Sequence, residues 1–229
     1  MYFDILTIFP EVFKTYFETS IIKRAQEKKI AKINVYNLRD WTNDSHQSVD
    51  DVPFGGGVGM IFKVEPIFQA VKDLKKKQKK KKCQVILFSA KGKKLNQKKA
   101  KELAQNDRLI LICPRYEGVD ERVAKYIADE EISIGDYILT GGELPAMVLV
   151  DSVVRLLPGV IKEESLLEES FAPNLELLGE YPQYTRPAVF YPKKNNKKIS
   201  WQVPKVLTSG NHQKIQEWKI KHFKKIPKG

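Results

Sequence analysis

The chain of 229 residues is long enough for one large domain, or for one domain with a small satellite. Apolar residues make up 42% and charged residues 30%, which is typical of a globular chain and excludes disorder of the whole chain. No stretch approaches the roughly 18 uncharged apolar residues of a membrane-spanning helix, so an integral membrane protein is excluded. Residues 1–4 include an early acid and no basic segment, so we expect no signal peptide.

Two cysteines, Cys83 and Cys113, both lie in apolar runs. Two cysteines cannot form a disulfide framework for a chain of this length. We therefore expect reduced, buried thiols and a cytoplasmic protein.

The net charge of +12 is distributed unevenly. Residues 61–113 carry 16 basic and 4 acidic side chains, a net charge of +12, whereas residues 114–190 carry −9 and residues 191–229 carry +10. Two basic segments flanking an acidic middle favour a polyanionic partner such as nucleic acid. A solvated lysine-rich surface is the alternative, above all for the run at residues 75–82.

The first part of the chain alternates strand-like and helical patterns. Residues 2–8 predict a strand, Pro10 opens a helical stretch to about residue 28, and residues 32–38 predict a second strand. Residues 40–60 hold no periodic pattern and end in a glycine-rich run, a long loop of the kind usually kept for function.

The central part continues the alternation. It predicts helices over residues 64–74, 96–104 (with Asn96 as the N-cap) and from Pro145 onward, and strands over residues 84–88, 109–113 and 132–134. Strands that are apolar on both faces and separated by helices indicate an α/β fold, with a parallel sheet covered by helices on both faces.

The pattern changes after about residue 172, where a segment rich in Pro, Asn, Tyr and Lys is expected to be a linker up to residue 200. Asn211 is expected to cap a last helix with lysines on one side. The opposite side is an apolar stripe of Ile215, Trp218, His222 and Ile226. We therefore expect a large domain over residues 1–162, a linker over residues 163–200 and a small basic helical domain over residues 201–229.

Several common enzyme classes are excluded by their missing motifs. The glycines at 55, 56, 57 and 59 follow Pro53 instead of a strand, and no Gly-Lys-Ser/Thr follows them, so neither a dinucleotide fingerprint nor a P-loop is present. No Gly-x-Ser-x-Gly elbow occurs. The three histidines include no pair at ligand spacing before the last helix, so no metal site is indicated.

Three loops that follow predicted parallel strands combine glycine with polar residues. They span residues 89–92, 114–118 and 135–142. Ligands of open α/β sheets bind just outside the carboxyl ends of the strands, so the three loops together favour a small-molecule pocket. Any one of them alone would be an ordinary strand-to-helix turn.

The residues of these loops closely resemble the bacterial tRNA (guanine-N1)-methyltransferase family of the SPOUT class. The resemblance rests on residues 49–57, 115–122, 133–145, 151–155, 184–187 and 207–212, in order over nearly the whole chain. It implies a homodimer that binds S-adenosylmethionine in a deep trefoil knot and makes 1-methylguanosine at tRNA position 37, next to the anticodon. The implied partner is tRNA, with no membrane.

The resemblance also implies the site residues. Glu169, which precedes Ser170 and Phe171, matches the catalytic carboxylate, and Arg155 matches the family arginine. Substrate binding is implied for Asp50, Gly59 and Ser170. The implied cofactor pocket consists of Leu87, Phe88, Ser89, Pro114, Arg115, Tyr116, Glu117, Gly118, Ser133, Ile134, Gly135, Asp136, Tyr137, Ile138, Leu139, Gly141, Gly142 and Pro145.

The chemistry agrees with these roles. A carboxylate is suited to remove the guanine N1 proton as general base, and a cation offsets negative charge at O6. The sulfonium activates its own methyl group, so Mg²⁺ is optional for the transfer and the sequence does not indicate it. The chain departs from the family at Glu169 (usually Asp), Pro114 (usually Gly) and Gln183 (often His).

Other interpretations remain open. Arg155 stands four residues after Asp151 and is suited to a helix-face ion pair, and Glu169 belongs to a cluster of acids that is suited to a solvated surface. A SPOUT methyltransferase acting on another RNA atom, such as a ribose 2′-hydroxyl, is the alternative enzyme. A non-catalytic RNA-binding relative is the alternative from another class.

Overall fold

The structure, a computed structural model, describes residues 1–76, 82–162, 165, 181–192 and 199–224. The chain divides into two compact units, Met1–Lys162 and Glu163–Gly229. Within the described residues, no helix is long and apolar enough to cross a membrane.

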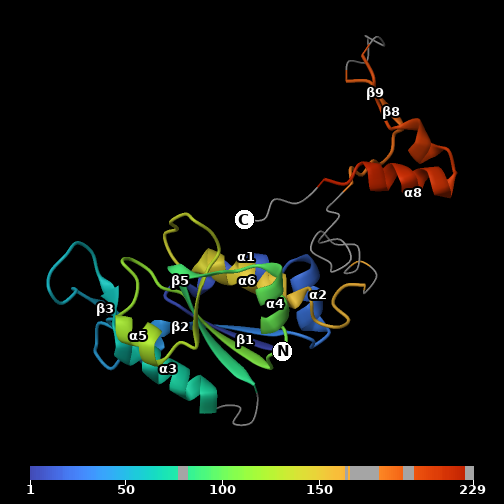
Figure 1. Ribbon diagram of the computed structural model, residues 1–229. Coiled ribbons are helices and arrows are strands. Elements are labelled where there is room, and N and C mark those ends of the chain that lie inside the picture. Colours follow the sequence, from blue (N-terminus) through green and yellow to red (C-terminus); the bar gives the residue numbers. More distant parts are fainter. Residues whose placement is uncertain (77–81, 163–164, 166–180, 193–198, 225–229) are drawn as a thin grey trace. The chain divides into compact units, whose positions relative to one another are not determined.

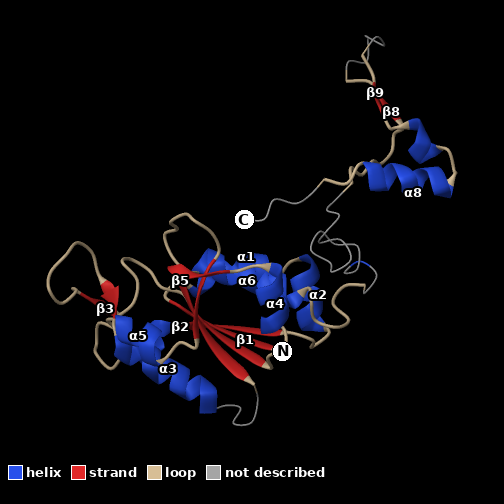
Figure 2. Cartoon of the chain, viewed as in Figure 1, coloured by secondary structure: helices blue, strands red, loops and turns tan. Residues whose placement is uncertain are grey.

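The first unit is built on a five-stranded sheet in the order β2-β1-β6-β5-β7, in which every neighbouring pair is parallel (Figure 2). The strands are β1 (Tyr2–Thr7), β2 (Lys32–Asn37), β5 (Cys83–Lys94), β6 (Arg108–Ile112) and β7 (Glu130–Ser133). This confirms the α/β class predicted from the apolar runs. Alternate residues enter opposite cores: Ile86 and Phe88 pack on one face of the sheet, Val85 and Leu87 on the other.

Helices cover both faces, as Figure 1 shows. One face carries η1 (Pro10–Phe13), α1 (Lys14–Phe17), α2 (Ser20–Glu27), α4 (Gln97–Leu103) and α6 (Glu143–Val154); the other carries α3 (Val64–Lys76) and α5 (Glu121–Tyr126). Helix α3 buries Ile67, Ala70, Val71 and Leu74 at spacings of three and four, the pattern of an amphipathic helix packed on a sheet.

Strand β5 is longer than predicted, and this corrects the expected loop at residues 89–92. Its first half pairs with β7 through Phe88 and Ile132; after a register shift, Lys93 pairs with Ile132 again. The two backbones approach closely at Gly92, where a Cβ would lie 2.6 Å from the amide nitrogen of Ile132. The sequence pattern ended this strand too early because its second half is an exposed lysine-rich segment with no apolar alternation.

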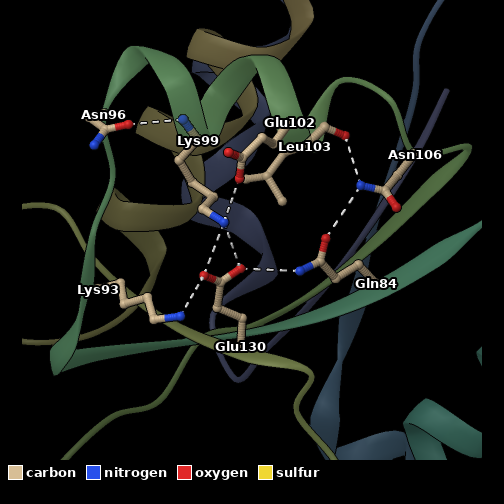
Figure 3. A network of polar contacts seen from close by, with 8 residues as sticks. All are labelled: Gln84, Lys93, Asn96, Lys99, Glu102, Leu103, Asn106 and Glu130. Atoms are coloured by element: carbon tan, nitrogen blue, oxygen red, sulfur yellow. Dashed lines mark hydrogen bonds and ion pairs between the residues drawn. The ribbon is translucent and has the colours of Figure 1, made fainter.

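A polar network fixes this edge of the sheet (Figure 3). The side chain of Glu130, which is 10% exposed, lies 3.1 Å from Nζ of Lys99 on α4 and 3.9 Å from Nζ of Lys93 on the second half of β5. It also accepts a 3.2 Å hydrogen bond from Gln84. Asn96 caps α4 as predicted, accepting from the amide of Lys99 at 2.9 Å. The network therefore ties α4 and both halves of β5 to β7.

Two features of the first unit were not predicted. Helix α5 begins after its N-cap Asp120 and buries Val123. It contains too few residues for a periodic pattern of apolar side chains to be recognised in the sequence. The expected loop over residues 40–60 is overlapped at its start by η2 (Leu38–Trp41), and it contains β3 (Asp50–Asp51), which pairs antiparallel with β4 (Ile61–Phe62) just beyond its end. This short ladder closes the glycine-rich loop into a hairpin.

The second unit contains β8 (Val189–Phe190), β9 (Trp201–Gln202), η3 (Lys205–Thr208) and α8 (His212–Lys221). Asn211 caps α8 as predicted, accepting from the amide of Lys214 at 3.0 Å. In the stripe on α8, the rings of Trp218 and His222 stack at 4.1 Å, whereas Ile226 lies outside the described residues.

The expected linker contains a strand. Residues 189–190 pair antiparallel with β9, and the rings of Phe190 and Trp201 lie 5.5 Å apart. Aromatic cross-strand packing stabilises this ladder in a segment whose composition favours a coil. The unit is therefore not purely helical. Most of residues 163–180 and residues 193–198 lie outside the described residues.

Candidate active site

A cavity of about 550 Å³ opens where the parallel pairing of β5, β6 and β7 ends. This is the position predicted for a pocket in an open α/β sheet. The residues that line it are Leu87–Lys91, Pro114–Val119, Glu121, Ala124, Glu131–Gly135, Tyr137–Gly142 and Pro145, each range taken in full.

The loop after β6 forms one wall through a left-handed turn. Tyr116 has a φ of 57° and Gly118 a φ of 112°, so the chain reverses sharply there. The carbonyl of Gly118 accepts a 3.0 Å bond from the amide of Phe62, and the amide of Glu117 donates to Met60 at 3.1 Å. The hairpin thus holds this wall in place.

The loop after β7 forms the opposite wall and is bonded to the first. The amide of Gly142 donates to the carbonyl of Pro114 at 2.9 Å, and a Cβ on Gly142 would lie 2.6 Å from the Cα of Cys113. Only glycine permits this approach. Pro114 therefore keeps its acceptor role in this contact and lacks only the amide donor that the family's glycine has.

All the residues expected from the sequence to bind the cofactor line this cavity, except Asp136, which forms an ion pair with Lys94. Their role in binding stays a prediction. Lining residues that sequence reasoning missed are Ala90, Lys91, Val119, Glu121, Ala124, Glu131, Ile132 and Thr140. Lys91 and Thr140 fall inside loops that had been singled out, whereas Glu121 and Ala124 belong to the unpredicted α5.

A buried ion pair lies beside the cavity. Oε2 of Glu143 lies 3.0 Å from Nε of Arg115, and Oε1 accepts a 2.8 Å bond from the hydroxyl of Thr7. The side chain of Glu143 is 5% exposed and that of Arg115 is 24% exposed. Burial and the neighbouring Glu143 carboxylate raise the pKa of the Cys113 thiol well above its ordinary value. Glu143 falls within the motif over residues 133–145, but it was not among the site residues expected from the sequence.

Arg155 stands at the other end of α6 from the cavity. Pro145 lines the cavity in the first turn of α6, while Arg155 caps the carboxyl end of the same helix. Ten residues of α-helix span about 15 Å. Asp151, the alternative ion-pair partner of Arg155, accepts a 2.7 Å hydrogen bond from the hydroxyl of Tyr16.

The residues expected to bind the substrate differ in how close they lie to the cavity. Gly59, with a φ of 88°, lies against Glu117 of the cavity wall, since a Cβ there would be 2.6 Å from the Cγ of Glu117. Asp50 pairs with Phe62, whose ring lies 5.9 Å from that of the cavity-lining Tyr116. Glu169 and Ser170 lie outside the described residues.

An exposed apolar face lies over η1, α1 and α6. Its members and their exposed fractions are Phe9 (37%), Val12 (42%), Tyr16 (42%), Leu144 (57%) and Val148 (46%). Leu144, Val148 and Asp151 follow one side of α6 at helical spacing, and Tyr16 bonds Asp151. We call this set the α6 face. These five residues are among the exposed large hydrophobic side chains of the described part of the chain.

Both cysteines are free thiols; Cys113 is buried and Cys83 is half-buried. In the part of the chain that the structure describes, no group of three or more His, Cys, Asp or Glu side chains could hold a metal ion.

Comparisons with known proteins identify a family. Residues 1–227 match the family described as tRNA (Guanine-1)-methyltransferase TrmD. A tRNA (guanine-N(1)-)-methyltransferase of Dictyoglomus turgidum is 56% identical over 95% of this chain and 83% of its own length. The protein of that name from Clostridioides difficile is 48% identical over 100% of this chain and 94% of its own length. The crystal structure of tRNA (m1G37) methyltransferase from Aquifex aeolicus is similar with a TM-score of 0.77 and 40% identity, over 97% of this chain and 88% of that one.

Proposed function

We propose that this chain, which belongs to the tRNA (guanine-1)-methyltransferase family, transfers a methyl group to N1 of the guanosine at tRNA position 37, next to the anticodon. The family match over residues 1–227 carries the proposal. The cavity at the carboxyl ends of the parallel strands supplies a place for the methyl donor.

The residues around the cavity fit S-adenosylmethionine. Apolar side chains such as Leu87, Ile134 and Leu139 offer a surface for the adenine ring. The closely packed glycine loops bring backbone donors and acceptors to the edge of a flat heterocycle. When bound, S-adenosylmethionine supplies an electrophilic methyl group. The other cofactor residues expected from the sequence, Asp136 excepted, would complete the pocket.

The deep trefoil knot of the SPOUT class is part of the proposal. Two observations support it: the register shift that brings β5 past Ile132 twice, and the bond between the loops after β6 and β7 through Gly142 and Pro114. A chain that returns so closely on its own path is what a knotted cofactor site requires.

Glu169 and Arg155 would carry the chemistry on the guanine. The carboxylate of Glu169 removes the proton from guanine N1 as general base, and the guanidinium of Arg155 stabilises the negative charge that develops at O6. Asp50, Gly59 and Ser170 would hold the guanosine, and Gly59 already lies against the cavity wall. Mg²⁺ stays optional for the transfer.

The distance along α6 supports a homodimer. Arg155 lies about 15 Å from the cavity end of its own helix, too far for its side chain to act beside a methyl donor held there. A second copy packed on the α6 face would bring another Arg155 near the cavity, and that face is apolar and exposed. The active site would then take residues from both subunits.

We also propose the expected domain roles. Residues 1–162 bind the cofactor, residues 163–200 carry Glu169 and Ser170, and residues 201–229 contribute positive charge to the grip on tRNA. The cytoplasm, where tRNA is processed, is the proposed compartment.

Mass spectrometry of nucleosides tests the function directly. Unmodified tRNA treated with the protein and S-adenosylmethionine should yield 1-methylguanosine, and tRNA with adenosine at position 37 should not. A ribose-methylated nucleoside would favour the alternative SPOUT activity, and no methylation would favour a non-catalytic RNA-binding protein.

A further inference from the structure

Glu143 is a buried acid with no part in the proposed chemistry. It stands in the first turn of α6 with 4% of its surface exposed. A buried carboxylate is costly unless it is paired and hydrogen-bonded. Glu143 meets both conditions through Thr7 at the end of β1 and Arg115 in the loop after β6. Three segments far apart in the sequence therefore meet at one carboxylate.

The contacts of Arg115 define the orientation of its guanidinium. Nε donates to Glu143 at 3.0 Å, on the buried side. Nη1 lies 3.5 Å from the hydroxyl of Thr140, which lines the cavity. The guanidinium carbon lies 4.7 Å from the centroid of the Phe9 ring, a cation–π distance. The planar group is thus held at one edge and on one face, and it reaches toward the cavity.

Gly141 provides the space for this pair. A Cβ on Gly141 would lie 2.5 Å from Oε2 of Glu143 and 2.5 Å from Cδ of Arg115. Gly141 also forms an antiparallel bridge with Arg115. Any side chain at this position would displace the ion pair, so the loop is shaped around it.

Arg115 differs from the other cation in the cavity wall. Among the described residues that line the cavity, Lys91 and Arg115 are the basic ones. Lys91 lies 2.8 Å from Glu121 and 4.0 Å from Glu131, two carboxylates with partly exposed side chains in the same wall. Arg115 instead pairs with one carboxylate, through Nε, while its Nη1 lies toward the cavity-lining Thr140. An anionic group that enters this cavity is therefore best received at Arg115.

We propose that Glu143 is a positioning residue that orients the guanidinium of Arg115 to bind the carboxylate of the methyl donor's methionine portion. This rests on the proposed binding of S-adenosylmethionine in the cavity. A carboxylate matches the planar guanidinium fork, and Arg115 is only 24% exposed within a cavity of small-molecule size. A tRNA phosphate has the same anionic chemistry, so the test must separate the two sources.

The test compares two ligands by calorimetry: S-adenosylmethionine and its decarboxylated analogue. Glu143→Gln removes the negative charge and leaves one acceptor oxygen in place of the two that accept from Thr7 and from Nε of Arg115. It should weaken S-adenosylmethionine binding about tenfold, while affinity for the decarboxylated analogue changes less than twofold. The matched control is Glu121→Gln, which removes the acid paired with Lys91 and should not discriminate between the ligands.

Arg115→Lys keeps the positive charge at a partly exposed position. It should show the same selective loss of affinity for S-adenosylmethionine. It decides the question if circular dichroism shows that Glu143→Gln does not fold. Equal losses for both ligands would overturn the proposal, because Glu143 would then only support the fold. A loss of tRNA affinity with unchanged cofactor affinity would overturn it in favour of a phosphate. A wild-type protein that binds neither ligand would instead refute the proposed cofactor site.

Discussion

The hydroxyl of Tyr16 donates a 2.7 Å hydrogen bond to Oδ2 of Asp151, and this bond joins α1 to α6 on the α6 face. The hydrogen bond to Asp151, followed by burial and the negative charge of Asp151, raises the pKa of Tyr16 to about 12. Only the neutral phenol donates this bond. Because the folded pKa lies above the ordinary value of 10, the stabilisation is present below about pH 10 and is lost as the pH rises through 12.

We therefore expect one tyrosine to ionise late. The pH is raised in a rapid jump, and the phenolate absorbance is read before the protein unfolds. The difference in absorbance between the unaltered protein and Tyr16→Phe reports the ionisation of Tyr16 and should have its midpoint near pH 12. Asp151→Asn should move this midpoint back toward 10. A midpoint near 10 in the unaltered protein would show that the bond does not form in solution.

The α6 face should hold two subunits together. Val148→Asp places a charge on this face, and burying an unpaired charge costs several kcal/mol, so the dimer dissociation constant should rise by roughly 100-fold or more. Sedimentation velocity measures the change. Phe68→Asp is the control, since Phe68 is 47% exposed on α3, on the opposite side of the sheet. A fully active monomeric wild type would contradict the shared active site.

Glu169→Gln should lower turnover by roughly 10²–10⁴, the usual contribution of a general base, and leave cofactor affinity nearly unchanged. Single-turnover kinetics on unmodified tRNA measures this. Glu169→Asp should retain activity, because the family normally has the shorter acid. Glu168→Gln is the neighbouring control, and equal losses at the two positions would place the base elsewhere, with Asp50 as the next candidate.

The affinity for tRNA should fall steeply with salt, because the segments at residues 61–113 and 191–229 carry net charges of +12 and +10. Binding to a polyanion releases counterions, so the logarithm of the binding constant falls linearly with the logarithm of the salt concentration. Cofactor affinity should hardly change over the same range. Filter binding and calorimetry at several salt concentrations give the two slopes, and a flat response for tRNA would exclude electrostatic recognition.

Local sequence patterns predicted the α/β class and the parallel strands of the first unit. Apolar runs such as the one in β6 predicted the buried parallel strands, because a strand covered on both faces needs apolar side chains in both directions. Asn96 and Asn211 predicted their helix starts, because an N-cap depends on residues only a few positions away. The three glycine-bearing loops predicted where the cavity lies.

Features that join distant segments had no such signal. The second half of β5 is a strand only because its backbone pairs with β7 across the register shift at Gly92, while its lysines alone favour an exposed loop. Glu143 resembles an ordinary first-turn acid; its burial depends on Thr7, 136 positions earlier in the chain, and on Arg115. Local patterns report the neighbours of a residue along the chain, whereas burial and pairing depend on neighbours that only the folded chain brings together.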